Sequence, residues 1–319
     1  MNLAPAELDR LRGQINDRLG EVYPQGPGLL KEPVHYALAG KGKRLRPILT
    51  LLANQCLGGT VEGALHAAVA VEMLHNFTLV HDDIMDRDGM RHGQASVHAR
   101  WDDGVALLAG DAMLVLAIAE LRLSPAHGDA LMSSFTRGAL AVCEGQALDK
   151  EYEDRPMVSL DDYLRMIDLK TGHMLGMASE LGAIAAGANE EHINNLRRFG
   201  QLLGRAFQVQ DDLLEIFSDS HTMGKSLGSD ILSEKKTYLM VMALEAFPDR
   251  VHQATEAART DMAAGMEALR RLIDHEGIRS QAEESIVSTV AQAKRHLESV
   301  GPGKLVLADF ADMVLERDR

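Results

Sequence analysis

Two short acidic clusters are the part of this sequence best suited to chemistry. They are Asp82-Asp83-Ile84-Met85-Asp86 and Asp211-Asp212-Leu213-Leu214-Glu215. Helix residues four apart share a face, so Asp82 pairs with Asp86 and Asp211 with Glu215. These like charges repel, and no Lys or Arg lies four residues after any of these four paired carboxylates to offset them. One such pair is most often a solvated face, but two of similar form favour a site for Mg²⁺, which prefers oxygen ligands.

Basic residues follow both clusters and also gather in one segment near the N-terminus. Four cations lie within the six residues 41–46, between Gly40 and Pro47. In an acidic protein such a segment is a candidate anion site, although a solvated basic turn is the alternative. Met90-Arg91-His92-Gly93 follows the first cluster, and Gly224-Lys225 to Asp230 and Lys235-Lys236-Thr237 follow the second. This order favours phosphate held between Mg²⁺-bearing carboxylates and cations.

Long helices must position these residues. His75, Thr78, Asp82 and Asp86 follow steps of three or four, as do Gln208, Asp211, Asp212 and Glu215, so each set lies on one helix face. His81 points elsewhere and is interpreted as a structural histidine. No proline lies between Pro47 and Pro125 or between Pro156 and Pro248, which suits long helices. No stretch alternates as a strand does beyond a few residues. We expect one all-α domain over residues 1–319.

Composition excludes several classes of protein. The 319 residues carry a net charge of −14, which argues against nucleic acid as a partner. Cys56 and Cys143 are too few for a disulfide framework or a zinc cluster and are expected to be free thiols. The N-terminus lacks the apolar run of a signal peptide. The apolar run 112–119 is shorter than the ~20 residues of a spanning helix. We expect a cytoplasmic protein without a stable membrane span.

Taken together, these segments resemble the trans-isoprenyl diphosphate synthase family, which includes farnesyl and geranylgeranyl diphosphate synthases. Gly42–Pro47 is similar to the family's Gly-Lys-Arg-x-Arg-Pro segment. The segment from Asp82–Asp86 on to Arg91 is similar to the family's first aspartate-rich motif. Lys170-Thr171, Phe207-Gln208 and Asp211–Glu215 resemble the Lys-Thr pair, the Phe-Gln pair and the second acidic motif. The resemblance covers about residues 38 to 240, in the family's order and spacing.

The resemblance implies a role for each matching residue. The diphosphate of isopentenyl diphosphate would be bound by Lys43, Arg46 and His75, with His92 at a position where the family usually has Arg. Mg²⁺, three ions per site, would be held by Asp82, Asp86 and Asp211, with Asp83, Asp212 and Glu215 as weaker or indirect ligands. The allylic diphosphate would be held by Arg91, Lys170, Lys225 and Lys235, and Thr171 and Gln208 would turn oxygens towards the allylic cation. The catalytic set is then Asp82, Asp86, Asp211, Lys170, Thr171 and Gln208.

The resemblance also implies a fold and an activity. The fold would be a bundle of about ten or more helices around a central active-site cavity, normally a homodimer. The activity would be Mg²⁺-dependent condensation of isopentenyl diphosphate with dimethylallyl, geranyl or farnesyl diphosphate. Mg²⁺ would act as a Lewis acid for departure of the allylic diphosphate, and cationic side chains would stabilise the charge that develops. A neutral His92 would bind diphosphate more weakly than Arg does. Glu215 in place of Asp and Glu234 in place of Gly are further departures from the family pattern.

Two other functions stay open at this point. A terpene cyclase also ionises allylic diphosphates, but it needs no second diphosphate site such as Lys43, Arg46 and His75, and only 4% of residues here are aromatic. A catalytically silent regulatory subunit would not need two intact acidic clusters.

Product length is expected to depend on the helix before Asp82. Leu74, Phe77 and Thr78 are the candidate pocket floor, with Phe77 roughly 7–8 Å along the axis from Asp82. The alternative is that Phe77 is simply a core residue. In the family, paired aromatic residues at these positions go with the fifteen-carbon product. A lone aromatic beside a small residue such as Thr78 resembles synthases that make geranylgeranyl diphosphate, the product expected here, with farnesyl diphosphate as the alternative.

Overall fold

The structure is a computed structural model that describes residues 3–40, 42–217, 235–301 and 303–316. The regular structure of these residues is helical apart from one two-stranded hairpin, which confirms the all-α prediction. By its internal contacts the chain divides into two compact units. The first unit is Met1–Ala139, Met174–Gly200 and Lys294–Arg319, and the second is Leu140–His173 and Gln201–Ala293. A single domain over residues 1–319 stays a prediction.

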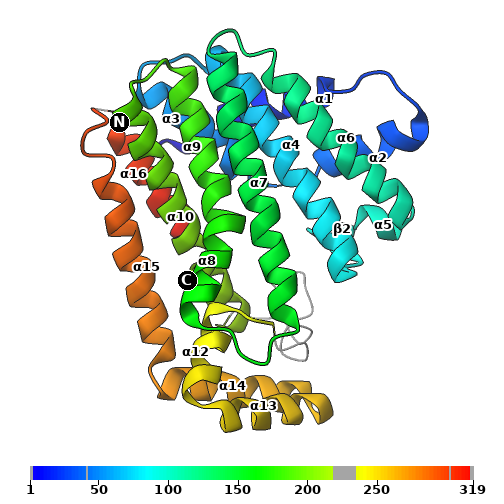
Figure 1. The fold of residues 1–319 in the computed structure, drawn as a ribbon, viewed down its shortest axis with the longest axis vertical. Helices are drawn as coiled ribbons and strands as arrows, with labels where there is room; N and C mark the ends of the chain where they lie inside the picture. The colour runs from blue at the N-terminus through cyan, green and yellow to red at the C-terminus, as the bar shows by residue number, and fades with distance from the viewer. Residues whose placement is uncertain (1–2, 41, 218–234, 302, 317–319) are drawn as a thin grey trace. The chain divides into compact units, whose positions relative to one another are not determined.

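The first unit is built around the 26-residue helix α4 (Val61–Asp86). Its other helices are α1 (Pro5–Glu21), α2 (Gly28–Leu38), α3 (Leu45–Cys56), α5 (Val97–Arg100), α6 (Asp103–Leu121), α9 (His173–Ala185) and α16 (Lys304–Leu315). Thr60 caps α4 by accepting a hydrogen bond from the N–H of Gly63 (3.2 Å). Figure 1 shows α4 beside α6, the helix with which α4 makes its most extensive contact. Small residues of α6 such as Ala106, Ala109 and Gly110 are buried and allow this close approach.

A short hairpin follows α4. Strands β1 (Met90–Arg91) and β2 (Gln94–Ala95) are antiparallel, with Met90 opposite Ala95 and Arg91 opposite Gln94. The two turn residues, His92 and Gly93, have φ values of 50° and 77°. Positive φ at both central residues is the type I′ turn, which matches the twist of a two-stranded hairpin. The hairpin therefore brings Arg91 back towards the end of α4.

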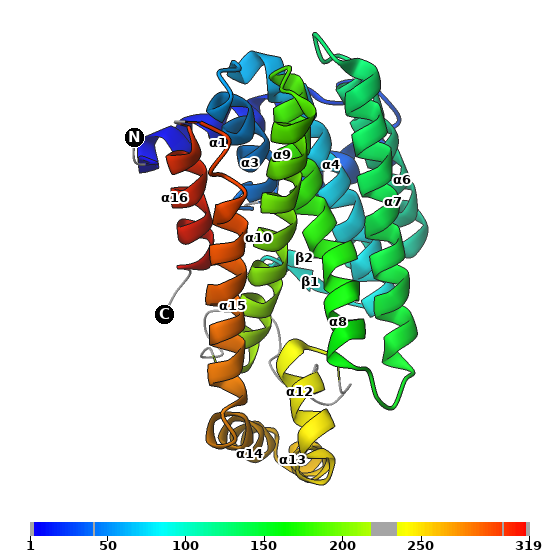
Figure 2. The same cartoon turned by 60° about the vertical axis from the view of Figure 1, so that its left-hand side comes forward.

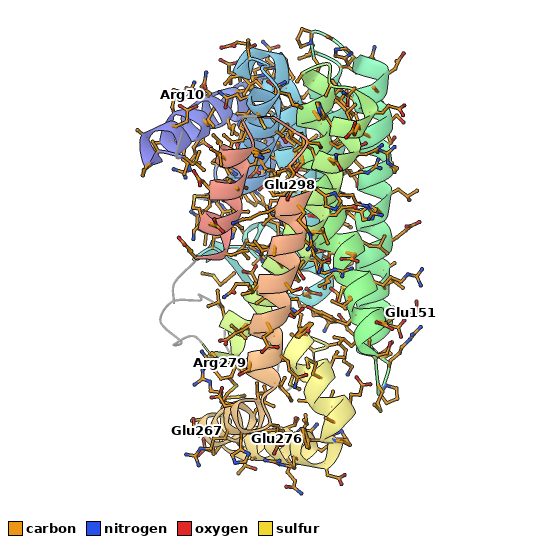
Figure 3. All side chains as sticks on the ribbon, turned by 90° about the vertical axis from the view of Figure 1, so that its left-hand side faces the viewer. Arg10, Glu151, Glu267, Glu276, Arg279 and Glu298 are labelled. Atoms are coloured by element: carbon orange, nitrogen blue, oxygen red, sulfur yellow. The ribbon has the colours of Figure 1, made fainter. Side chains whose placement is uncertain are left out.

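The second unit contains the shorter helices. They are α8 (Leu160–Ile167), the π-helix η1 (Asp168–Gly172), α12 (Tyr238–Ala246), α13 (Pro248–Thr260) and α14 (Met262–His275). Besides α9, whose first residue His173 belongs to the second unit, three helices contribute residues to both units, namely α7 (Gly128–Glu153), α10 (Glu190–Phe217) and α15 (Ile278–Arg295). Figure 2 shows α13 against α14. Arg250 of α13 donates a hydrogen bond of 2.5 Å to Glu276, just beyond α14 and labelled in Figure 3.

The apolar run 112–119 is part of α6, which is longer than that run. The whole helix is long and apolar enough to cross a membrane by length and composition alone, which the length of the run did not indicate. Within its most apolar window, 44% is buried inside the protein, and a core helix meets the same criteria. Both cysteines are free thiols, as predicted, and burial raises the pKa of Cys56 to about 11.

Candidate active site

The first acidic cluster occupies the C-terminal end of α4. Asp86 is the last helical residue and is exposed, Asp82 lies one turn before it and is partly buried, and Arg87 ends the helix in a left-handed conformation (φ 55°). The last turn of α4 contains no basic residue. A helix C-terminus carries partial negative charge, so these carboxylates add to an existing negative field. Such an arrangement is unfavourable for the isolated helix and favours a bound cation.

Asp83, between these two residues, has a different environment. Its side chain is 4% exposed and accepts a hydrogen bond of 2.8 Å from Nε of Arg91, and Nη2 of Arg91 contacts the same oxygen. Arg91 also lies 3.5 Å from Asp88. The hairpin therefore places the Arg91 guanidinium on Asp83, whereas the sequence analysis assigned Arg91 to a substrate diphosphate and Asp83 to the metal set.

The second cluster repeats this arrangement in the second unit. Asp211 and Glu215 lie on one face near the C-terminal end of α10 and are partly buried, and the last turn again has no basic residue. Asp212 is 4% exposed and accepts hydrogen bonds from the hydroxyl of Tyr163, the N–H of Tyr238 (2.7 Å) and the amide of Gln208 (3.0 Å). Burial raises the pKa of Asp212, and these three donors act in the opposite direction. Each cluster thus has an outer carboxylate pair and a middle carboxylate held by protein donors.

The predicted anion site in the first unit contains an arginine–histidine pair. Nη1 of Arg46 lies 3.1 Å from Nε2 of His75. Arg has only donors, so Nε2 must accept and the proton of the neutral ring must be on Nδ1. Burial, and then the charge of Arg46, hold the pKa of His75 well below its usual range. The side chain of Lys43 is exposed on the preceding loop.

Arg44 is a structural residue that the sequence analysis missed. It adopts a left-handed conformation (φ 54°) and is 6% exposed. Its guanidinium donates to Glu72 (2.6 Å), to Oδ1 of Asn16 (3.0 Å) and to the carbonyls of Leu38 (2.6 Å) and Gly40 (2.9 Å). This side chain fixes the loop that carries Lys43. The sequence did contain a signal, because Glu72 interrupts the otherwise apolar run 67–74 and a buried carboxylate needs a partner.

The Lys170-Thr171 pair lies in the π-helix η1 of the second unit. Lys170 donates to Asp149 (2.8 Å), and the Thr171 hydroxyl donates to Oε1 of Gln208 (3.0 Å). A Cβ at Gly145 would lie 2.4 Å from the backbone nitrogen of Lys170, and a Cβ at Gly204 would lie 2.8 Å from the carbonyl oxygen of Thr171. Glycine therefore allows helices α7 and α10 to approach the π-helix closely. π-Helical turns are rare and frequently mark functional sites.

The remaining predicted phosphate-binding residues differ in their surroundings. Lys235 is partly buried just before α12, whereas Lys225 lies outside the described residues, as do Gly224, Asp230 and Glu234. His92 is exposed at the hairpin turn, and desolvation and the charge of Arg91 lower its pKa.

Of the three candidate chain-length residues, Leu74 and Thr78 lie four apart on one face of α4, and Phe77 lies about 100° from Thr78 around the helix. Leu74 is buried, and the hydroxyl of Thr78 donates to the carbonyl of His75 (2.8 Å). The ring of Phe77 stacks edge-on with that of His81, at 4.7 Å between centroids. Nε2 of His81 lies 3.3 Å from the carbonyl of Leu107 in α6, which supports a structural role for His81. At 100° per residue, Thr78 is about 40° from Asp82 around the helix and Phe77 about 140°.

The donor set at both clusters suits Mg²⁺. Among the described residues, no group of three or more His, Cys, Asp or Glu side chains could by itself hold a metal ion. Mg²⁺ typically binds one or two carboxylates and completes its octahedron with water and substrate phosphates. The outer pairs Asp82–Asp86 and Asp211–Glu215 provide such carboxylates.

Comparison with known proteins places this geometry in a family. The profile of the polyprenyl synthetase family matches residues 27–274. The chain belongs to this family. A geranylgeranyl pyrophosphate synthase from Geoglobus acetivorans is 37% identical over 96% of this chain and 95% of its own length.

Two solved structures extend the comparison. The geranylgeranyl pyrophosphate synthetase from Pyrococcus horikoshii has a TM-score of 0.90, 32% identity and 98% coverage of both chains. A polyprenyl synthase from Caulobacter crescentus, in complex with calcium and isoprenyl diphosphate, has a TM-score of 0.85, 27% identity and coverage of 99% and 96%. The similarity spans nearly the whole chain, well beyond the region around residues 38 to 240 that the motifs cover.

Proposed function

We propose that this protein is a prenyltransferase that condenses isopentenyl diphosphate with allylic diphosphates and releases geranylgeranyl diphosphate. The observation that carries the proposal is the combination of two helix ends rich in carboxylates with a separate Arg46–His75 anion site. Carboxylates can hold the metal ions that bind the diphosphate of the allylic substrate, whose carbon–oxygen bond breaks. Cationic side chains suit the diphosphate of isopentenyl diphosphate, whose carbon–oxygen bond stays intact. A relative 37% identical is a geranylgeranyl pyrophosphate synthase, which supports the choice of product.

Mg²⁺ is the proposed cofactor, with three ions per site as the family resemblance implies. When bound, it neutralises the leaving diphosphate as a Lewis acid. Asp82, Asp86 and Asp211 provide its carboxylate ligands, and Glu215 assists Asp211. Asp83 and Asp212 hold neighbouring groups in place, because protein donors already surround their carboxylates.

The basic residues divide between two substrates. Lys43, Arg46 and His75 bind the diphosphate of isopentenyl diphosphate, with His92 at its edge. His75 takes part as a neutral donor through Nδ1, because Nε2 faces Arg46. Lys170, Lys225 and Lys235 hold the allylic diphosphate, and Arg91 contributes to it from its position on Asp83. The oxygens of Thr171 and Gln208 stabilise the positive charge that forms when the carbon–oxygen bond breaks.

Leu74, Phe77 and Thr78 set the chain length. Thr78 is the residue nearest to the face of Asp82, and its small side chain leaves room for a long product. A larger side chain at this position, as in Thr78→Phe, shortens the product.

The active form is proposed to be a homodimer formed through α6. One face of this helix packs on α4, and the other exposes Leu107, Leu108 and Val115 by 47%, 58% and 65%. These residues recur at helical spacing on one face, which also contains the exposed Asp111, and a second copy would cover this face. Sedimentation velocity tests this point, since Leu108→Glu combined with Val115→Glu should yield monomers.

The test of the activity is an assay of the purified protein with Mg²⁺ and each substrate alone or both together. The proposal predicts turnover only with isopentenyl diphosphate and an allylic diphosphate together, and a twenty-carbon alcohol after dephosphorylation. Turnover of an allylic diphosphate alone would indicate a cyclase. No product under any condition would indicate a non-catalytic subunit, and a fifteen-carbon end product would indicate a farnesyl diphosphate synthase.

A further inference from the structure

A buried hydrogen-bond network in the second unit surrounds Asp212. Oδ1 accepts from Nε2 of Gln208 (3.0 Å), and Oδ2 accepts from the hydroxyl of Tyr163 and the N–H of Tyr238 (2.7 Å). At the other end of the Gln208 amide, Oε1 accepts from the hydroxyl of Thr171 (3.0 Å). Tyr163 and Asp212 are 2% and 4% exposed, and Thr171 is 6% exposed. The network joins α8, η1, α10 and α12.

This network determines which way the Gln208 amide points. A carboxylate only accepts hydrogen bonds, so the amide edge that faces Asp212 must be the NH₂ group. The oxygen then faces Thr171, whose hydroxyl gives its single proton to it and keeps its lone pairs for other partners. With the amide rotated by 180°, its oxygen would face the carboxylate, and the NH₂ group would take the place of the oxygen. That orientation is disfavoured because the amide oxygen of Gln208 and the carboxylate of Asp212, both acceptors, would be in contact.

Tyr163 holds the Asp212 carboxylate where it can accept the hydrogen bond from the NH₂ group of Gln208. Its hydroxyl is its only polar side-chain group, and burial together with the charge of Asp212 raises the pKa of that hydroxyl well above its usual range, so it remains a donor. The rings of Tyr163 and Tyr238 pack edge-on at 6.0 Å. Without the hydroxyl, Oδ2 would keep the N–H of Tyr238 as its partner in this network, and the carboxylate would gain rotational freedom.

We propose that Tyr163 and Asp212 are positioning residues that lock the polarity of the Gln208 amide, so that the oxygens of Gln208 and Thr171 face the allylic carbon. The inference rests on the proposed function for the identity of that carbon. It gives Asp212 a role other than metal ligation and assigns a function to Tyr163, which lies outside the acidic motifs. An amide in the wrong orientation would present positive NH groups where positive charge develops, and this would slow ionisation.

The test compares Tyr163→Phe with Tyr152→Phe. Tyr152 is also 2% exposed as a residue, and no hydrogen bond of its hydroxyl occurs among the described residues, so it controls for loss of a hydroxyl from a buried tyrosine. We expect Tyr163→Phe to lower kcat about tenfold, as for one lost hydrogen bond to a charged group, with an unchanged KM for isopentenyl diphosphate. Tyr152→Phe should keep the wild-type kcat. Wild-type kcat in Tyr163→Phe, or an equal loss in both variants, would overturn the proposal.

A double-mutant cycle separates positioning from a general structural effect. In a Gln208→Leu background the amide is gone, so Tyr163→Phe should cause no further loss of kcat. A second tenfold loss in that background would show that Tyr163 acts on something other than Gln208 and would overturn the proposal.

Hydrogen exchange of the substrate-free protein provides a readout that does not depend on the reaction. The Tyr238 N–H donates to Asp212, so Tyr163→Phe should accelerate exchange at the start of α12, and Tyr152→Phe should not. Unchanged exchange would show that Tyr163 does not hold Asp212. If the wild-type protein condenses nothing, the proposed function fails, but this measurement still decides whether the Tyr163–Asp212 lock exists.

Discussion

The substitution Glu72→Gln tests whether the buried Arg44–Glu72 pair organises the loop that carries Lys43. The two side chains are 5% and 4% exposed and are joined at 2.6 Å. Glutamine keeps the size of the side chain and one acceptor oxygen, but it removes the negative charge. Arg44 would then be buried without its counter-charge, while its bonds to Asn16 and two carbonyls remain.

The expected cost follows from these contacts. Removing one partner of a buried ion pair costs about 3–5 kcal/mol, and because several acceptors remain we expect about 2–3 kcal/mol. Glu62→Gln is the matched control, since Glu62 lies on the same helix and is exposed, and it should change stability by about 0.5 kcal/mol or less. The free energy of unfolding is measured by urea denaturation followed by circular dichroism.

The same variant has a kinetic consequence. A loosened loop should raise KM for isopentenyl diphosphate and leave KM for the allylic substrate unchanged, because the allylic site uses other residues. A stability loss no larger than that of Glu62→Gln, together with an unchanged KM, would refute the view that Arg44 organises this loop.

Three further predictions concern His92, Phe77 and His75. His92→Arg should lower KM for isopentenyl diphosphate by adding a charge-assisted contact, at a small cost in stability because the turn requires positive φ; an unchanged or raised KM would show that His92 does not contact this substrate. Phe77→Ala should shift the products to longer chains, measured by chromatography after dephosphorylation, and an unchanged distribution would place the pocket floor elsewhere. The pKa of His75 lies below that of an unfolded histidine, so the unfolded state binds more protons and stability should fall as the pH drops below about 6.5. Urea unfolding at several pH values should show that the free energy of unfolding falls less at low pH in His75→Gln than in the wild type. An identical pH dependence would contradict a buried neutral histidine.

Much of the fold could be predicted from the sequence because its signals are local. Proline-free stretches and polar residues at steps of three or four indicated α4 and α10, and the structure places an acidic cluster near the C-terminal end of each. The Arg46–His75 contact joins two segments that the motifs had already singled out.

Other features depend on contacts between distant residues. Whether Asp83 and Asp212 face solvent or protein is decided by Arg91, Tyr163 and Tyr238, and spacing within the cluster does not reveal those partners. Nor does the sequence around Lys170 identify a π-helix, because that geometry needs glycine in neighbouring helices at Gly145 and Gly204. The inward direction of Arg44 follows from its left-handed backbone conformation, which a basic segment does not predict.

The central claim is that carboxylates at the ends of α4 and α10 bind the Mg²⁺ ions needed for condensation. Its most direct test is the rate of condensation across a Mg²⁺ titration that ends in excess chelator. The rate should vanish in chelator, and Asp82→Ala and Asp211→Ala should each lower it on the order of 100-fold or more at saturating Mg²⁺. Asp129→Asn, a change at an exposed position of α7, should behave as wild type. Substantial turnover in excess chelator, or in both alanine variants, would contradict the account.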